Sequence, residues 1–232
     1  MIDIANTKFG SFLGYSNDYL FQQIKRGEFH DPDVGDFINK NITKDNICID
    51  IGANIGAISV FLSKKCKKLY CIEPQHNIFL ALCGNLFINE CYNTVPLEFA
   101  AYSKNSTFSI ASKEKLDDWV GDIDKGYENV KSFGSVSVEE NNLGNIIGKK
   151  LDDIVTDKID FIKCDAEGGD LDALIGCERI IKEHSPKIIF EFHLQCTKKC
   201  YNRTWNDYED FFNNIKYKLE KISDSNYLAI KI

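Results

Sequence analysis

A single ten-residue stretch, residues 47–56, constrains the fold of this chain more than any other segment. It reads Ile-Cys-Ile-Asp-Ile-Gly-Ala-Asn-Ile-Gly. The apolar residues around Cys48 predict a buried parallel strand, and Asp50 lies where that strand ends. Gly52 permits a sharp turn, and Gly56 lets the following helix approach the strand or a ligand closely. The stretch therefore predicts the first strand–turn–helix unit of an open α/β sheet, whose helix N-terminus faces a nucleotide-binding crevice.

The spacing of the glycines narrows the class of ligand. The pattern D-x-G-x-x-x-G differs from G-x-G-x-x-G, which cradles the pyrophosphate of a dinucleotide. S-adenosylmethionine has no pyrophosphate, so the pattern favours it over NAD. Glu73 ends the next predicted strand, where a carboxylate can accept hydrogen bonds from both ribose hydroxyls of a nucleoside. The alternative for Glu73 is an exposed strand-end residue without a ligand.

A repeated strand–helix alternation predicts a parallel sheet. The first predicted strand ends at residue 50, and the others cover residues 69–72, 95–100, 159–165 and 187–193. One helix is predicted after each of the first two strands, and another begins near residue 169. The chain ends in a predicted antiparallel hairpin over residues 217–222 and 227–232. Such a hairpin beside a parallel sheet suits a methyltransferase better than a dehydrogenase.

The length of 232 residues fits a single domain, 1–232, with two additions to the sheet. Residues 1–45 predict a short hairpin followed by helices. Residues 103–148 interrupt the alternation with β-like pieces at 107–111 and 135–138, and predict an insertion that acts as a lid or acceptor-specificity element. Its aromatic residues Trp119, Tyr127 and Phe133 are candidates for stacking on a sugar, with ordinary packing as the alternative.

Composition excludes several function classes. The formal net charge of -7 argues against a sequence-independent nucleic-acid binder, which needs a basic face. No apolar run is long enough to span a membrane, so no membrane partner is expected. The nine cysteines follow no signal segment, and Cys48, Cys71 and Cys164 fall in predicted core strands. This placement predicts reduced thiols and a cytoplasmic location.

Charged residues also gather at the ends of two later strands. Lys163 and Asp165 share one face of their strand, and Glu191 and His193 share one face of the next. A buried lysine needs a carboxylate partner, so an internal salt bridge is the structural alternative to a catalytic role. In the catalytic interpretation, His193 or a carboxylate is the general base for a hydroxyl. Alternatively, Asp165 and Glu191 hold a divalent cation such as Mg²⁺ that lowers the pKa of the hydroxyl.

At these residues the chain resembles the FkbM-type S-adenosylmethionine-dependent methyltransferases, over roughly residues 28–194. The resemblance rests on five motifs in order: residues 50–56, Glu73-Pro74, 151–154, 163–168 and 186–191. It implies an α/β, Rossmann-like class I methyltransferase fold: a three-layer sandwich around a mostly parallel seven-stranded sheet with a C-terminal antiparallel hairpin. The motifs and the resemblance together give the cofactor-binding residues Asp50, Gly52, Ala53, Asn54, Gly56, Glu73, Pro74, Ala101 and Asp165.

The function expected from these patterns is methyl transfer from S-adenosylmethionine to an oxygen of a small-molecule or glycan acceptor. The resemblance suggests a hydroxyl of a sugar or glycan unit, or of a secondary metabolite. An RNA ribose methyltransferase and a non-catalytic cofactor-binding protein are the alternatives, and the acidic charge opposes the RNA acceptor. The predicted catalytic residues are Asp165, Lys163, Glu191 and His193.

Overall fold

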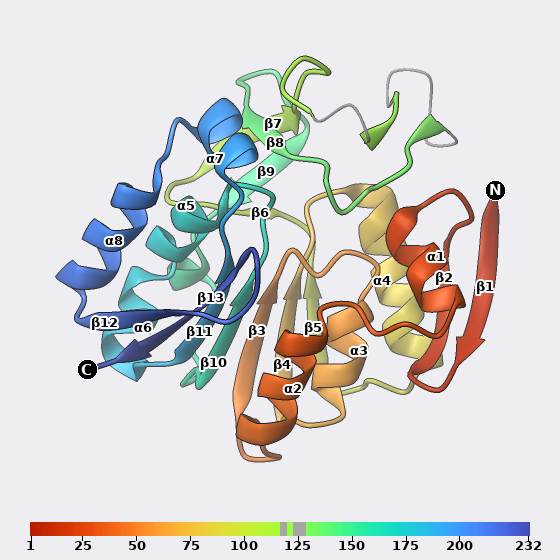
Figure 1. Cartoon of the computed structure of the whole chain (residues 1–232), viewed down its shortest axis with the longest axis horizontal. Coiled ribbons are helices and arrows are strands. Elements are labelled where there is room, and N and C mark those ends of the chain that lie inside the picture. The colour runs from red at the N-terminus through yellow and green to blue at the C-terminus, as the bar shows by residue number, and fades with distance from the viewer. Residues whose placement is uncertain (117–119, 123–128) are drawn as a thin grey trace.

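A computed structural model describes residues 1–116, 120–122 and 129–232. Within these residues the central sheet has seven strands, and Figure 1 shows helices on both of its faces. Five strands are parallel, and the last two form an antiparallel hairpin whose second strand pairs with the rest of the sheet. The strand order is β12 (Tyr217–Lys221), β13 (Asn226–Lys231), β11 (Lys187–Glu191), β10 (Phe161–Cys164), β3 (Ile47–Ile51), β4 (Lys68–Ile72) and β5 (Thr94–Leu97). The predicted fold class is confirmed.

Alternating side chains divide the core into two layers. In β3, Ile49 and Ile51 face one apolar cluster, whereas Cys48 belongs to the cluster on the other side of the sheet. The layer beside Cys48 includes α1 (Tyr19–Lys25), α2 (Pro32–Asn41), α3 (Ala57–Ser63) and α4 (His76–Ile88). The opposite layer includes α5 (Asp170–Ile175), α6 (Glu178–His184) and α8 (Trp205–Asn214).

A second, smaller sheet lies beyond the carboxyl ends of the parallel strands (Figure 1). Its strand order is β6 (Ala100–Ala101), β9 (Ile146–Lys149), β7 (Ser106–Ile110) and β8 (Val138–Glu140). The strand predicted at 95–100 is therefore wrong at its end, because the chain leaves the central sheet after Leu97 and Ala100 pairs with Gly148. The β-like piece predicted at 135–138 is also wrong, because the strand begins only at Val138.

The segment after β10 differs from the single helix predicted there. A turn at Gly176 and Cys177 separates α5 from α6. A short 3₁₀ helix, η4 (Leu151–Asp153), precedes β10 in the chain. A Cβ atom on Gly176 would lie 2.1 Å from the carbonyl oxygen of Tyr102, so only glycine fits this contact. Asp152 accepts hydrogen bonds from the backbone of Arg179 and Ile180 and thereby caps α6. Sequence reasoning missed α7 (Leu194–Tyr201), which follows β11.

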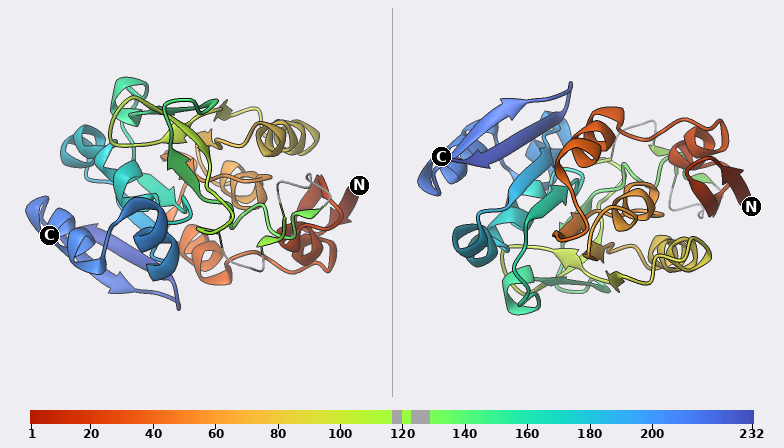
Figure 2. Two further views of the ribbon diagram at one scale, coloured as in Figure 1. Left: turned by 90° about the horizontal axis from the view of Figure 1, so that it is seen from above. Right: turned by 90° about the horizontal axis from the view of Figure 1, so that it is seen from below.

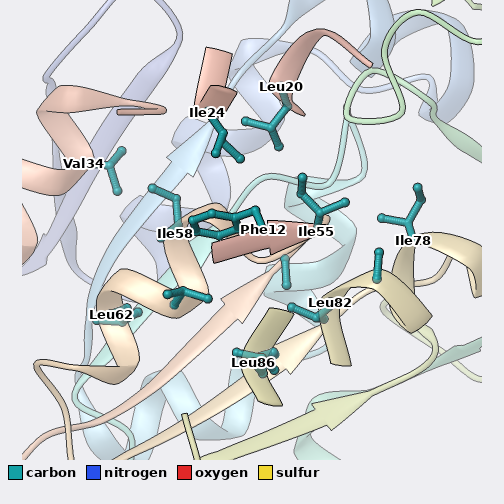
Figure 3. Packing of buried hydrophobic residues seen from close by; sticks show 14 of the residues in the cluster. Phe12, Leu20, Ile24, Val34, Ile55, Ile58, Leu62, Ile78, Leu82 and Leu86 are labelled. Atoms are coloured by element: carbon teal, nitrogen blue, oxygen red, sulfur yellow. The ribbon is translucent and has the colours of Figure 1, made fainter. Parts of the chain in front are cut away.

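The N-terminal hairpin, β1 (Ile2–Thr7) and β2 (Gly10–Tyr15), packs against α4 at the opposite end of the molecule from the C-terminal hairpin (Figure 2). Phe12 enters the cluster formed by α1, α3 and α4 (Figure 3). The fully buried Asn85 joins three elements: its Oδ1 accepts from Leu13 N at 2.6 Å, and its Nδ2 donates to Leu13 O and Ile55 O. The Asn85 side chain thus satisfies backbone N–H and C=O groups of β2 that would otherwise pair with a neighbouring strand.

Replacing Asn85 by alanine is expected to lower the free energy of unfolding by about 3 kcal/mol, since it leaves buried backbone groups without partners. Urea unfolding followed by circular dichroism measures this loss. Asn89→Ala is the matched control one helical turn later, because Asn89 makes similar bonds to Ser11 but is only half-buried. An equal loss in the two variants would contradict the role assigned to Asn85.

Candidate active site

A cavity of about 260 Å³ opens at the carboxyl ends of β3, β4, β10 and β11. Its walls come from the loops that follow these strands, from the α1–α2 loop, from α7 and from the small sheet. The fold therefore brings together segments that lie as far apart in the sequence as residues 19 and 201. This is the edge at which open α/β sheets bind their ligands.

The glycine turn after β3 forms one wall of the cavity. Gly52 has φ of +73°, and a Cβ atom there would lie 1.7 Å from the carbonyl oxygen of Asp165, so a side chain is excluded on both grounds. The backbone N–H groups of Gly52 and Ala53 donate to Ile72 O at 3.0 and 2.9 Å. Gly52, Ala53 and Asn54 line the cavity, as a cofactor-binding role requires.

Asp50 and Gly56 do not line this cavity, so the direct cofactor contact predicted for them needs correction. Asp50 is fully buried beneath it and accepts a 2.5 Å hydrogen bond from Ser59 Oγ. Gly56 begins α3 with φ of +91°, where an added Cβ would approach Leu82 to 2.8 Å. Both residues support the turn from below, through close packing of α3 against the sheet.

Glu73 is a buried carboxylate that faces the cavity. Its Oε2 accepts from Asn54 N at 3.0 Å and its Oε1 accepts from Gln75 N at 2.8 Å. Burial raises the pKa of Glu73 to about 7, although the two backbone bonds oppose the shift. Each oxygen retains lone-pair capacity for a further donor.

Lys163 lies between two carboxylates at the cavity floor. Its Nζ is 3.1 Å from Asp165 Oδ2 and 3.6 Å from Asp50 Oδ1, and the lysine side chain is 5% exposed. Burial alone would lower the pKa of Lys163, but the two carboxylates outweigh it and raise the pKa. Burial alone would raise the pKa of Asp165, but the Lys163 ammonium outweighs it and lowers the pKa. Asp165 is therefore held as a carboxylate at the cavity wall.

Three carboxyl groups converge at the ends of β10 and β11. Oxygens of Asp165, Glu167 and Glu191 lie within 4.8 Å of one another, and all three residues line the cavity. Burial, together with the charge of Asp165, raises the pKa of Glu191 to about 9 and raises that of Glu167 well above its usual range. The predicted convergence of Asp165 with Glu191 is seen, and Glu167, which was not among the predicted catalytic residues, joins it.

The two histidines at the cavity are placed differently. His193 is an exposed residue at the start of α7, because β11 ends at Glu191 and its alternation stops there. The predicted convergence of His193 with Asp165 and Glu191 is therefore wrong. Among the described residues, the clusters around Asp165 do not include His193. His30, which sequence reasoning passed over, has a ring nitrogen within 4.8 Å of carboxylate oxygens of Asp31 and Asp165. The only signal was its position before Asp31-Pro32, a helix start.

Groups along the cavity suit a nucleoside-containing cofactor. Pro74 and Ala101, predicted to bind the cofactor, contribute apolar wall to the cavity. Gln75 Nε2 donates to Phe133 O at 3.1 Å, whereas the buried Gln75 Oε1 has no hydrogen-bond partner among the described residues. A buried acceptor without a partner is costly, so this oxygen fits a donor on a ligand. With Glu73, the cavity therefore offers acceptor side chains to hydroxyl or amino donors of a ligand.

Residues of the small-sheet segment form another wall of the cavity, and Gly134 there lies close to Asn54 of the glycine turn. Phe108, residues 132–136 and Val138 line it, and Ser137 Oγ donates to Glu167 O at 2.8 Å. Phe133 is buried, with its ring centroid 4.8 Å from that of Tyr15, so packing explains it without a sugar. Trp119 and Tyr127, the other stacking candidates, lie outside the described residues.

Comparison with known proteins agrees with this geometry. The FkbM methyltransferase domain family matches residues 50–219. A solved FkbM methyltransferase from Methylobacillus flagellatus KT is 19% identical, with a TM-score of 0.52 over 82% of this chain and 44% of that one. This chain thus spans less than half of that protein. A putative caffeoyl-CoA O-methyltransferase from Staphylococcus aureus is 13% identical, with a TM-score of 0.55 over 94% of this chain and 93% of that one. An rRNA methylase from Streptococcus thermophilus is 12% identical, with a TM-score of 0.51 over 86% and 94%.

A search of curated proteins finds no match to this chain. In the part of the chain that the structure describes, no helix has the length and apolarity needed to cross a membrane. The solved structures share the fold at low identity, whereas the family match covers most of the chain, including the glycine turn, Glu73 and the carboxyl cluster. The chain belongs to the FkbM methyltransferase family, in the S-adenosylmethionine-dependent class.

Proposed function

We propose that this protein transfers the methyl group of S-adenosylmethionine to a hydroxyl oxygen of a sugar or glycan unit. One observation carries the proposal: a single cavity joins the glycine turn and Glu73 to a cluster of titratable side chains. The first part would hold the cofactor through Gly52, Ala53, Asn54 and Glu73. The second part lies where an acceptor hydroxyl can be oriented and lose its proton.

The charges of the lining favour a polyhydroxyl acceptor over a phosphorylated one. Five carboxyl groups line the cavity: Asp31, Glu73, Asp165, Glu167 and Glu191. Lys163 is the one lysine or arginine among the described residues that line the cavity, and its ammonium already pairs with carboxylates. Carboxyl groups accept hydrogen bonds from sugar hydroxyls but repel phosphates. RNA and other polyanions are therefore disfavoured as acceptors.

When bound, S-adenosylmethionine supplies a methyl group activated by a positively charged sulfur. The chain's own groups align the acceptor, exclude water and remove a proton. Asp165, kept ionised by Lys163, orients the hydroxyl and offsets positive charge nearby. Burial raises the pKa of Glu191 to about 9, so it is protonated near neutral pH and can donate to an acceptor oxygen, and the pKa of Glu167 is raised in the same direction. The buried setting strengthens each of these interactions.

A divalent cation is a second way to activate the hydroxyl. The oxygens of Asp165, Glu167 and Glu191 are the hard ligands that Mg²⁺ prefers, and they lie close enough to share one ion. Because the raised pKa values of Glu167 and Glu191 favour their protonated forms, such an ion would have to displace protons. Cation dependence would therefore strengthen as pH rises.

The proposal is tested by incubating the protein with S-adenosylmethionine and a panel of sugars, sugar nucleotides and oligosaccharides, with and without a chelator. Mass spectrometry would detect the gain of one methyl group, and a short RNA and a catechol serve as competing acceptor classes. We expect methylation of a sugar hydroxyl. Methylation confined to RNA or catechol would refute the sugar acceptor, and abolition by the chelator would establish the cation.

Cofactor affinity is expected to depend on pH through Glu73. Its pKa is about 7, and only the carboxylate can accept a hydrogen bond from each ribose hydroxyl at both oxygens. The affinity for S-adenosylhomocysteine should thus be full above pH 8 and fall by up to about tenfold per pH unit below 7. Calorimetric titration between pH 5.5 and 8.5 measures it. Affinity that is constant or increases toward low pH would contradict this linkage.

A further inference from the structure

Gln75 carries a buried acceptor that no group of the described chain uses. The residue follows Glu73-Pro74, lines the cavity and is 7% exposed. Its Oε1 has no hydrogen-bond partner among the residues that the structure describes. A buried acceptor left unpaired destabilises the folded protein, so such atoms are rare and each calls for an explanation. A donor group on a ligand in the cavity explains this one.

The main chain of Phe133 decides which end of the Gln75 amide is left for a ligand. Gln75 Nε2 donates to Phe133 O at 3.1 Å. A carbonyl oxygen only accepts hydrogen bonds, so the NH₂ end must face Phe133 and the two ends of the amide are not interchangeable. A small rotation about the last side-chain torsion, which is broad in glutamine, can bring Oε1 to a donor in the cavity. A ligand therefore meets an acceptor at this position.

Phe133 is itself held by the N-terminal segment. Asp18 is buried, and its Oδ1 accepts from Phe133 N at 3.0 Å while its Oδ2 accepts from Phe21 N at 2.9 Å. The ring of Phe133 packs against that of Tyr15, with 4.8 Å between the centroids. These contacts fix the Phe133 carbonyl relative to the start of α1, and that carbonyl in turn orients the amide of Gln75.

The order of the strands places Gln75 on the cofactor side of the cavity. It follows β4, whereas the carboxyl cluster follows β10 and β11, and β3 with its glycine turn lies between β4 and β10. The backbone N–H of Gln75 donates to Glu73 Oε1 at 2.8 Å. Gly134, next to Phe133, lies close to Asn54 of the glycine turn. The Gln75 side chain therefore lies beside both elements that would hold the nucleoside.

We propose that Gln75 Oε1 accepts a hydrogen bond from the adenosine part of S-adenosylmethionine, and that residues 132–134 orient it for this contact. The inference rests on the cofactor binding of the proposed function and deepens it. Part of the insertion then serves cofactor recognition rather than acceptor specificity. Adenosine offers donors at its 2′-hydroxyl, its 3′-hydroxyl and its 6-amino group, and an amide oxygen accepts from O–H and N–H alike.

Calorimetric titration of Gln75→Met with S-adenosylhomocysteine at pH 8 tests the inference. Methionine is close to glutamine in length but is only a weak acceptor, so we expect the dissociation constant to rise about tenfold. Gln22→Met is the matched control, because Gln22 Nε2 also donates to a carbonyl, that of Ser16, but Gln22 lies outside the lining of the cavity. A dissociation constant of Gln75→Met within about twofold of the native value would overturn the proposal.

Analogues of S-adenosylhomocysteine separate a direct contact from a loosened cavity wall. Each analogue lacks one donor: the 2′-hydroxyl, the 3′-hydroxyl or the 6-amino group. The analogue without the donor that Gln75 accepts should lose little affinity on the Gln75→Met substitution, whereas the other analogues should lose the full factor. The cycle thereby identifies the donor. An equal loss for S-adenosylhomocysteine and every analogue would overturn the proposal, since it would show that the substitution only disturbs the site.

Failure of this inference and failure of the proposed function give different results. A native protein that binds S-adenosylhomocysteine, beside a Gln75→Met variant of unchanged affinity, would overturn the role of Gln75 alone. A native protein that does not bind S-adenosylhomocysteine would overturn both. The substitution removes an unpaired acceptor together with one hydrogen bond, so the apo variant should keep its fold, which circular dichroism checks.

Discussion

Replacement of Lys163 by methionine is expected to lower the free energy of unfolding by about 3–5 kcal/mol. The substitution removes the positive charge between Asp50, which is fully buried, and Asp165. Asp50 then retains Ser59 as a hydrogen-bond donor but has no neutralising charge, and burial favours its protonation. Urea unfolding of the apo protein at pH 8 measures the loss.

Two controls separate this effect from simple loss of a lysine. Lys68→Met removes a lysine that is 37% exposed and pairs with Asp157 at 2.6 Å, and it should cost about 1 kcal/mol or less. The double variant Lys163→Met with Asp50→Asn should recover part of the stability, because it removes the orphaned charge as well. A loss below about 1 kcal/mol for Lys163→Met alone would contradict the network described here.

Replacement of Glu73 by glutamine is expected to weaken S-adenosylmethionine binding by about 10²-fold. A glutamine has one acceptor oxygen, and its NH₂ group would face a backbone N–H of Asn54 or Gln75. Loss of hydrogen bonds to a charged group is worth about 3 kcal/mol here, which corresponds to that factor. Calorimetric titration at pH 8 measures the dissociation constant.

At pH 8 the same substitution also removes a buried negative charge from the apo protein, which offsets part of the cost of the donor pair at Asn54 or Gln75. Because burial raises the pKa of Glu73, the native state binds its proton more tightly than the unfolded state does. The contribution of this group to stability is therefore full below the unfolded pKa and is lost as pH rises through about 7. Glu98→Gln is the matched control. Glu98 follows β5 but is exposed, so the affinity of this variant for S-adenosylmethionine should match that of the native protein. Equal affinities of the two variants would contradict the assignment of Glu73.

The sequence predicted the sheet well because its strands are short apolar runs with fixed alternation. The pairing of Asp50 with Lys163 across β3 and β10, by contrast, depends on strand order, which residue periodicity does not give. In the segment set apart by its broken rhythm, the piece predicted at 107–111 matches β7, whereas β8 begins later than predicted and β9 was not predicted. The short strands β6 and β9 pair across more than forty residues. Such long-range pairings depend on tertiary structure rather than on local propensity.

The cofactor side of the site was predicted in more detail than the acceptor side. The glycine turn and Glu73 are contiguous motifs whose geometry follows from backbone conformation. His30 and Glu167 were missed because their positions depend on the packing of Phe29 and on a left-handed backbone at Glu167, with φ of 49°. Neither feature has a sequence signature. Asp50 was predicted to contact the cofactor because it ends a strand. That position does not reveal whether a side chain lines the cavity or is buried beneath it, as Asp50 is.

The central claim is that this cavity binds S-adenosylmethionine through Glu73 and the glycine turn. Calorimetric titration of the native protein with S-adenosylmethionine and, separately, with NAD tests it most directly. The structure predicts one binding site for S-adenosylmethionine and no binding of NAD, whose pyrophosphate has no cradle here. No heat of binding with S-adenosylmethionine, or equal affinity for NAD, would contradict the account.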